Sequence, residues 1–192
     1  TMKKIILFSL LSFATICLAQ KEPSISIPLD PETKLYTYSE VIDASEKAPK
    51  EMYNNSKSWM AQKYSDSDFI VDDSLSKLVD LGSFRITSLI GAGLVKIPFN
   101  FTILYTITLG FKDGRYRYII DNIKTSFGDS DADTPQTLET FASSYKEMEI
   151  GKKRQIKFIE DTCQILDEKM KKTIKEIKEG VIGGASKKND DW

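Results

Sequence analysis

The sequence predicts an α+β fold: one antiparallel sheet packed by helices on one face, in the order β-α-β-β-β-β-α, with a long C-terminal helix. Two patterns lead to this prediction. Apolar and polar residues alternate over 97–123, which is typical of strands with one buried face. Towards the C-terminus, apolar residues recur at spacings of three and four, which is typical of an amphipathic helix. The length of 192 residues, with 41% hydrophobic and 29% charged residues, suits a single globular domain.

The first half of the chain is expected to form a strand, a helix and two short strands. Residues 35–42 contain several β-forming residues and predict the first strand. Residues 49–64 predict a helix, because a leading proline suits a first turn and apolar residues follow at spacings of three and four. Short apolar runs at 69–71 and 84–90 predict the next two strands.

The clearest local signal is a hairpin. Asp113-Gly114 forms a two-residue turn, which requires positive φ at both positions. A slip of one residue would bury Arg115 and Arg117, so the register is strongly specified. The turn pairs Lys112 with Arg115, Phe111 with Tyr116, Leu109 with Tyr118 and Ile107 with Ile120.

Two helices are expected after the hairpin. Thr134-Pro135 predicts the start of a short helix, which ends before Gly151. A helix of about 28 residues then follows and ends at Gly180. Its apolar stripe is expected to pack on the sheet, or alternatively to pair two copies as a homodimer. Cys163 lies on this stripe and is expected to be a buried, inert thiol. The stripe consists of Ile156, Ile159, Cys163, Leu166, Met170, Ile174 and Ile177.

The N-terminal segment has the pattern of a cleaved secretory signal. Lys3 and Lys4 precede an apolar stretch of about 14 residues, which is short against the roughly 20 that span a membrane. Cleavage is expected near Ala19-Gln20; the alternatives are a membrane anchor and a lipoprotein attached through Cys17. The predicted organisation is therefore a signal peptide at 1–19, an extended leader at 20–34, one α+β domain at 35–180 and a flexible tail at 181–192.

Composition excludes several classes of enzyme. The chain has no histidine, so Ser-His-Asp and Cys-His nucleophiles and His-ligated metal sites are absent. Its two cysteines are too few for a thiolate zinc or iron–sulfur cage. A hydrolase with paired carboxylates is a minor alternative, because no two acids can be placed together from the pattern. We therefore expect a protein that is not an enzyme and needs no cofactor.

Two groups of residues are candidates for binding. Arg115 and Arg117, which alternate with Tyr116 and Tyr118, are candidates for contact with a ligand or partner. The acidic loop places Asp129, Asp131 and Asp133 at the first, third and fifth positions of a calcium loop, although Thr134 occupies the position that needs glycine. The basic runs at 152–154 and 169–172 are interpreted as a solvated helix face. With 27 basic and 28 acidic residues, the chain lacks the positive charge of a nucleic-acid-binding protein.

Several short sequence segments resemble those of a family of secreted bacterial proteins, the domain of unknown function 4468. The resemblance covers about residues 36–125 and implies a fold like that of the TATA-box-binding protein (TBP-like). DNA binding does not follow from it, because function resides in sites rather than folds. The matching segments are Tyr38-Ser39-Glu40-Val41-Ile42, Lys50-Glu51-Met52-Tyr53 followed by Trp59, Gly91-x-Gly93, and Lys112-Asp113-Gly114-Arg115-Tyr116-Arg117-Tyr118.

These observations together predict an exported, non-catalytic envelope protein that acts as a binding module. We expect it in the periplasm or secreted, with no membrane span after signal cleavage. Its partner is then another envelope protein. The alternative is a carrier that holds a small apolar ligand or lipid between the sheet and the C-terminal helix. The many aromatic residues on one face of the 97–123 hairpin favour this alternative, although a packed core explains them equally well.

Overall fold

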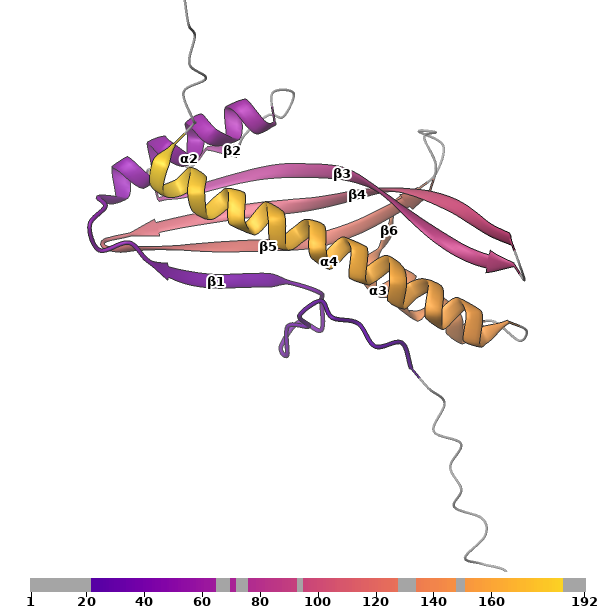
Figure 1. The fold of residues 1–192 in the computed structure, drawn as a ribbon. Coiled ribbons are helices and arrows are strands. Elements are labelled where there is room, and N and C mark those ends of the chain that lie inside the picture. Colours follow the sequence, from indigo (N-terminus) through magenta and orange to yellow (C-terminus); the bar gives the residue numbers. More distant parts are fainter. Residues whose placement is uncertain are drawn as a thin grey trace, which may run out of the picture.

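The computed structural model describes residues 22–64, 70–71, 76–92, 95–127, 134–147 and 151–184. They form an antiparallel sheet with helices on one face, and the longest helix crosses the sheet diagonally (Figure 1). The strands lie in the order β1-β5-β4-β3-β2, and β6 also pairs with β5. The elements are β1 (Tyr38–Asp43), α2 (Pro49–Lys63), β2 (Ile70–Val71), β3 (Lys77–Ala92), β4 (Val95–Lys112), β5 (Arg115–Phe127), β6 (Gln136–Thr137), α3 (Leu138–Ser143), a 3₁₀ turn (Ser144–Glu147) and α4 (Lys152–Gly183). The predicted α+β class is confirmed.

The β4–β5 hairpin has the predicted register. Phe111 pairs with Tyr116 and Leu109 with Tyr118, and Gly114 has a φ of 67°. A bulge between Leu104 and Thr106 shifts the register further along. The inner face of β4, towards the helices, carries the buried residues Phe101, Ile103, Tyr105, Ile107, Leu109 and Phe111.

Strand β3 is longer than the apolar run at 84–90 predicts, because it begins at Lys77. Asp80 and Gly82 interrupt the apolar pattern, yet both pair with β4. Gly82 lies opposite Tyr105, and a Cβ at Gly82 would overlap the ring of that tyrosine. Glycine is therefore needed here for close packing across the two strands.

The short helix α3 begins later than predicted. Thr134-Pro135 does not start it, because Gln136 and Thr137 first form β6 beside β5. Thr137 is the N-cap, and its hydroxyl accepts a hydrogen bond from the Thr140 backbone N–H at 3.2 Å. The expectation of a helix entry at Thr134-Pro135 is therefore wrong by about one turn.

Helix α4 continues past its predicted end at Gly180 to Gly183. Gly180 lies inside the helix and is packed against Trp59, while Val181 is buried. The side chain of Asn55 donates to the carbonyls of Val181 and Ile182, at 3.2 and 3.0 Å, and satisfies this end of the helix. Residues 181–183, placed in the tail by the sequence pattern, thus belong to the folded domain.

The predicted leader also contacts the domain. Ile27 is buried in the core, and Leu29 bridges to Tyr36. The backbone N–H of Ser24 donates to the carboxylate of Glu160 on α4 at 2.9 Å. The described part of the leader therefore packs against the sheet and α4.

Two carboxylates connect β1 and its neighbour β5 to α4. The Tyr38 hydroxyl donates to Asp167 at 2.8 Å, and Lys171 donates to the other oxygen of that carboxylate at 2.7 Å. Glu40 accepts from the Tyr118 hydroxyl at 3.0 Å and from Lys178 at 2.8 Å. With the apolar stripe of α4 buried beneath them, these contacts set the line that the helix follows across the sheet.

Candidate functional site

The arginine and tyrosine residues predicted as one site lie on opposite faces of the sheet. Arg115 and Arg117 are exposed on the outer face, away from the helices, and Arg117 donates to the Ser39 hydroxyl at 3.1 Å. Tyr116 and Tyr118 point inward and are only 1% and 5% exposed. Because neighbouring residues on a strand face opposite ways, the arginine side chains and the tyrosine side chains lie on different faces of the sheet.

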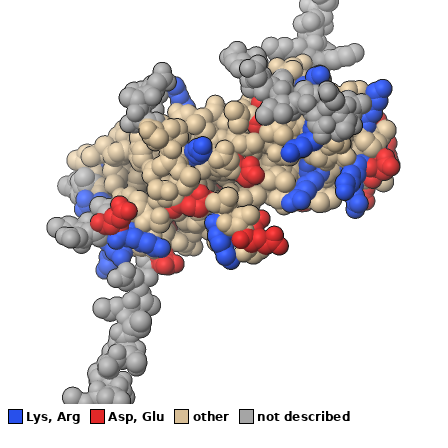
Figure 2. Space-filling model, turned by 180° about the vertical axis from the view of Figure 1, so that it is seen from behind, with Lys and Arg blue, Asp and Glu red and all other residues tan. Residues whose placement is uncertain are grey.

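The outer face of the sheet carries two small depressions beside the arginines, of about 380 and 220 Å³. Figure 2 views the molecule from this side and shows a broad uncharged surface between groups of charged residues. Arg117 is held by Ser39, and the neighbouring strand β1 contributes Val41, which is 58% exposed. The arginine pair stays a candidate for contact with a ligand or partner.

The acidic loop with Asp129, Asp131 and Asp133 lies outside the described residues. Within the described part of the chain, no three His, Cys, Asp or Glu side chains gather closely enough to hold a metal ion. The calcium hypothesis therefore stays a prediction.

Cys163, a residue of α4, is buried in the core, as its place on the apolar stripe predicts. Burial raises the pKa of its thiol to about 12. Since the thiolate is the reactive form, this cysteine has no nucleophilic role at neutral pH.

A groove of about 570 Å³ lies between the last part of β3 and the first half of α4. Five consecutive residues of β3, from Thr87 to Gly91, line it. Successive side chains of a strand point to opposite faces, so a groove that touches all five runs along the edge of the strand. From α4 and β4 the groove receives Lys96, Lys153, Arg154, Lys157, Phe158, Asp161 and Ile165.

The adjoining edge of β3 is open among the described residues. Strand β4 pairs with one side of β3 along its whole length, whereas β2 pairs with the other side only at Leu78 and Val79. No other described strand lies beside residues 80–91 of β3. This open edge forms one wall of the groove.

The opposite wall and the floor are apolar and tied to the sheet. Phe158 is buried and packs edge-on against Phe99 at 5.6 Å between ring centres. The hydroxyl of Thr162 is hydrogen-bonded to the buried hydroxyl of Ser88 at 2.8 Å, which fixes α4 to β3 below the groove. These two contacts hold α4 in place against β3 and β4 beside the groove.

The rim of the groove is positively charged. It carries Lys96 from β4 and Lys153, Arg154 and Lys157 from α4, against the single carboxylate of Asp161. Asp161 pairs with Lys157 at 2.9 Å. Lys96, Lys153 and Arg154 form no ion pair with another described residue. Three cations thus remain to attract a negatively charged group.

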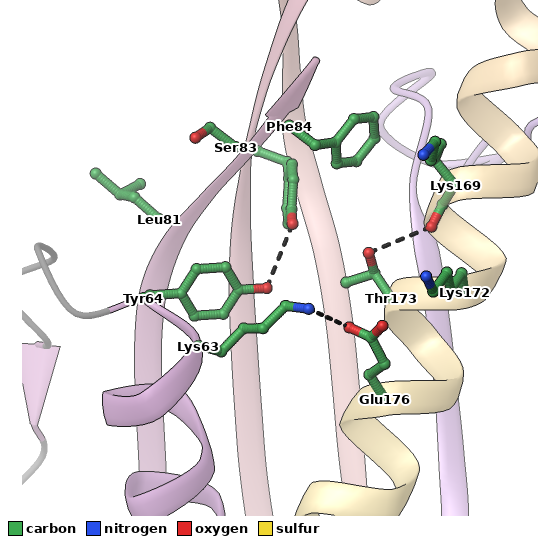
Figure 3. Close-up of a pocket in the computed structure, with 10 residues that line it drawn as sticks. Lys63, Tyr64, Leu81, Ser83, Phe84, Lys169, Lys172, Thr173 and Glu176 are labelled. Carbon is green, nitrogen blue, oxygen red and sulfur yellow. Dashed lines mark hydrogen bonds and ion pairs between the residues drawn. The ribbon is translucent and has the colours of Figure 1, made fainter. Parts of the chain in front are cut away.

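A second pocket, of about 510 Å³, lies between the end of α2, β3 and α4 (Figure 3). Four of its polar side chains contact one another: Lys63 pairs with Glu176 at 2.7 Å, and the hydroxyls of Tyr64 and Tyr105 lie 3.3 Å apart. Burial raises the pKa of both tyrosines, so they stay neutral. These contacts join α2 to α4, and the pocket is the weaker candidate for a ligand.

Sequence reasoning missed the groove. The basic run at 152–154 was expected to be a solvated face, and Lys153 and Arg154 are exposed as expected, but they also line the groove. A local signal existed, because Arg154 lies four positions, about one helical turn, before Phe158, a large apolar residue on the same helix. The open strand edge opposite them has no such signal in the sequence.

Comparison with known structures agrees on the fold. A crystal structure of a DUF4468 family protein from Bacteroides ovatus is 13% identical, with a TM-score of 0.52 over 79% of this chain and 90% of that chain. A crystal structure of a TBP-like protein from Parabacteroides distasonis is 12% identical, with a TM-score of 0.55 over 83% of this chain and 99% of that chain. No curated protein matches the chain.

A comparison with known sequence families also finds a match, and this match covers strands β1 to β5. Residues 38–126 match the family described as a domain of unknown function (DUF4468) with TBP-like fold. The matched stretch runs from the first residue of β1 into the last residues of β5. The predicted resemblance to this family of unknown function is therefore confirmed over β1 to β5, and with it the TBP-like fold.

Proposed function

We propose that this chain is an exported, non-catalytic binding protein that takes its partner into the groove between β3 and α4. The observation that carries this proposal is the groove itself, with an apolar floor, a cationic rim and a fixed shape. Its volume of about 570 Å³ lies within the range of about 300–1,000 Å³ that is usual for small binding sites.

Several features support a role without catalysis. The sequence contains no histidine, and the buried Cys163 is not poised to react. Asp161, the one acid of the groove, is paired with Lys157. The residues described as lining the groove include neither a histidine nor a cysteine.

Export is supported by the signal-like residues 1–19. No helix in the described residues is both long and apolar enough to cross a membrane. The place of action that we propose is the periplasm or the cell exterior, where an envelope protein is the expected partner. A homodimer through α4 would need the charged outer face of this helix, because its apolar stripe is buried.

The apolar floor favours a second candidate, a carrier of a small apolar ligand or lipid. Phe158, Ile165, Leu89 and Ile90 provide enough apolar surface for a short hydrocarbon. The two candidates share the groove and differ in the mass of its occupant.

Site-specific photo-crosslinking in the bacterial envelope tests the proposal. A photoreactive residue replaces Leu89, which lines the groove and is 47% exposed, and in a matched control it replaces Val41, which is 58% exposed and does not line the groove. We expect an adduct from position 89 and none from position 41. An adduct of several kilodaltons identifies a protein partner, and one of a few hundred daltons a lipid or small ligand. Equal adducts from both positions, or none from position 89, would contradict the proposal.

A further inference from the structure

We propose that the occupant of the groove is an extended, acidic peptide segment of a partner protein, which adds to the open edge of β3 at residues 87–91 as a further strand. This inference depends on the proposed function for the place of binding, and it names the chemistry of the partner. Two independent features of the groove lead to it: the backbone that forms one wall and the charge of the rim.

The first feature is the strand edge. Strand β3 pairs with β4 on one side, and residues 80–91 have no described strand on the other side. An open edge presents backbone N–H and C=O groups in the spacing that another extended chain satisfies. A hydrocarbon in the same place would leave these groups without partners as it displaced water. The edge therefore favours a peptide over a lipid.

The two walls of the groove determine where an added strand would lie. An added strand would lie between β3 and α4, because the groove is bounded by these two elements. Its side chains would alternate between two directions. One set would face the apolar surface of Phe158 and Ile165, and the other would lie towards solvent and the cationic rim. A segment in which apolar and acidic residues alternate fits both.

The second feature is the positive charge of the rim, which favours an acidic peptide segment over a basic one. Lys96, Lys153 and Arg154 are without ion-pair partners among the described residues, and Asp161 is already paired with Lys157. An acidic segment would gain three attractions, whereas a basic one would be repelled. The rim is also exposed, so the attraction is expected to weaken as salt is added.

Short synthetic peptides test the strand addition. The probe is a fluorescent peptide of alternating Val and Glu, and its comparator alternates Val and Lys. Two further acidic peptides carry N-methyl groups on alternate residues. In one peptide every Val is N-methylated, and in the other every Glu is N-methylated. Fluorescence anisotropy is measured with the folded chain 20–192 at low and physiological salt.

We expect the acidic peptide to bind and the basic peptide not to bind. Only one of the two N-methylated peptides should lose binding, because alternate N–H groups of an added strand face β3 and the others face away. If both N-methylated peptides bind like the parent, the peptide does not add as a strand. If the basic peptide binds equally well, or neither peptide binds, the inference is overturned.

Variants locate the binding on this groove. The double variant Lys153→Glu/Arg154→Glu reverses two rim charges, and Lys112→Glu/Arg115→Glu makes the same charge change on the outer face. We expect about tenfold weaker binding of the acidic peptide for the rim variant, since exposed pairs contribute only modestly, and no change for the control. Ile165→Trp, which fills the groove, should abolish binding. Thermal unfolding of each variant shows whether it folds, and equal weakening by both double variants would contradict the placement.

Different results would contradict the proposed function and the peptide inference. If crosslinking at position 89 yields a small apolar adduct and the peptides do not bind, the groove is a binding site but the peptide inference is wrong. If position 89 yields no adduct in the envelope, the proposed function itself fails. Peptide binding that survives Ile165→Trp would place the strand addition elsewhere.

Discussion

Trp59 of α2 lies against Gly180 of α4, where no larger side chain fits. Gly82 is likewise covered by the ring of Tyr105. Both glycines allow two elements to approach closely, and neither has a positive φ, so close packing and not backbone freedom requires them. The Gly180 contact brings α2 and α4 together on the same face of the sheet.

Gly180→Ala is expected to destabilise the protein. Alanine in a helix interior ordinarily stabilises by about 1 kcal/mol relative to glycine. Here the added methyl group would overlap the Trp59 ring, and overpacking costs about 1–3 kcal/mol, so the net effect is a loss of stability. Urea unfolding of the variant measures it.

Gly183→Ala is the matched control on the same helix. Nothing lies within 4 Å of a Cβ at Gly183, so this change should be neutral or slightly stabilising. A stabilised Gly180→Ala variant would show that Trp59 moves aside without cost.

At the scale of elements, α4 is attached to the sheet at both ends of its length. Near its start, Thr162 is hydrogen-bonded to Ser88 on β3, and near its end Lys178 pairs with Glu40 on β1. Between them, Asp167 accepts from Tyr38. The helix thus spans from β3 to β1 on a diagonal course (Figure 1). The groove lies beside its first half.

The attachment at Glu40 is expected to depend on pH. The hydrogen bond from Lys178, and then that from Tyr118, lower the pKa of the Glu40 carboxyl in the folded state. A lowered pKa stabilises the fold above the unfolded value of 4.5, and this contribution is lost as pH falls through the folded value. We therefore expect the melting temperature to fall on acidification below about pH 4.5, through this group among others.

Comparison with Glu40→Gln isolates the contribution of this carboxylate. The variant lacks the titrating group, so its melting temperature should fall less steeply over the same pH range. Its melting temperature should also be lower than that of the unaltered chain at neutral pH, where the ion pair is present. Parallel curves for the two proteins would show that Glu40 does not stabilise the fold.

At the scale of the whole molecule, the proposed export would determine which partners the groove can meet. The proposal predicts that the chain recovered from a bacterial envelope begins at Gln20. Replacing Ala19 by Arg, which removes the small residue at the cleavage position, should leave the longer form. N-terminal sequencing and intact mass measure both results. A chain that keeps residues 1–19 and stays in the cytoplasm would refute export, and a lipid-sized mass increase at Cys17 would indicate the lipoprotein alternative.

The sequence by itself determined the fold class, the β4–β5 hairpin and the apolar stripe of α4. These features are local: the Asp113-Gly114 turn fixes the pairing of adjacent strands, and the spacing of apolar residues marks the buried face of each element. The burial of Cys163 followed in the same way. The helix entry at Thr134-Pro135 was predicted wrongly because pairing of residues 136–137 with β5 replaced the local preference.

Only the tertiary structure decided where the groove lies. The groove needs Leu89 and Arg154 side by side although they are 65 positions apart, and it needs one edge of β3 to lie without a neighbouring strand. No local pattern records which strand lies at the edge of a sheet or along which line a helix crosses it. Those follow from the packing of Trp59 on Gly180 and the contacts of α4 with Ser88, Tyr38 and Glu40, which join segments distant in the chain.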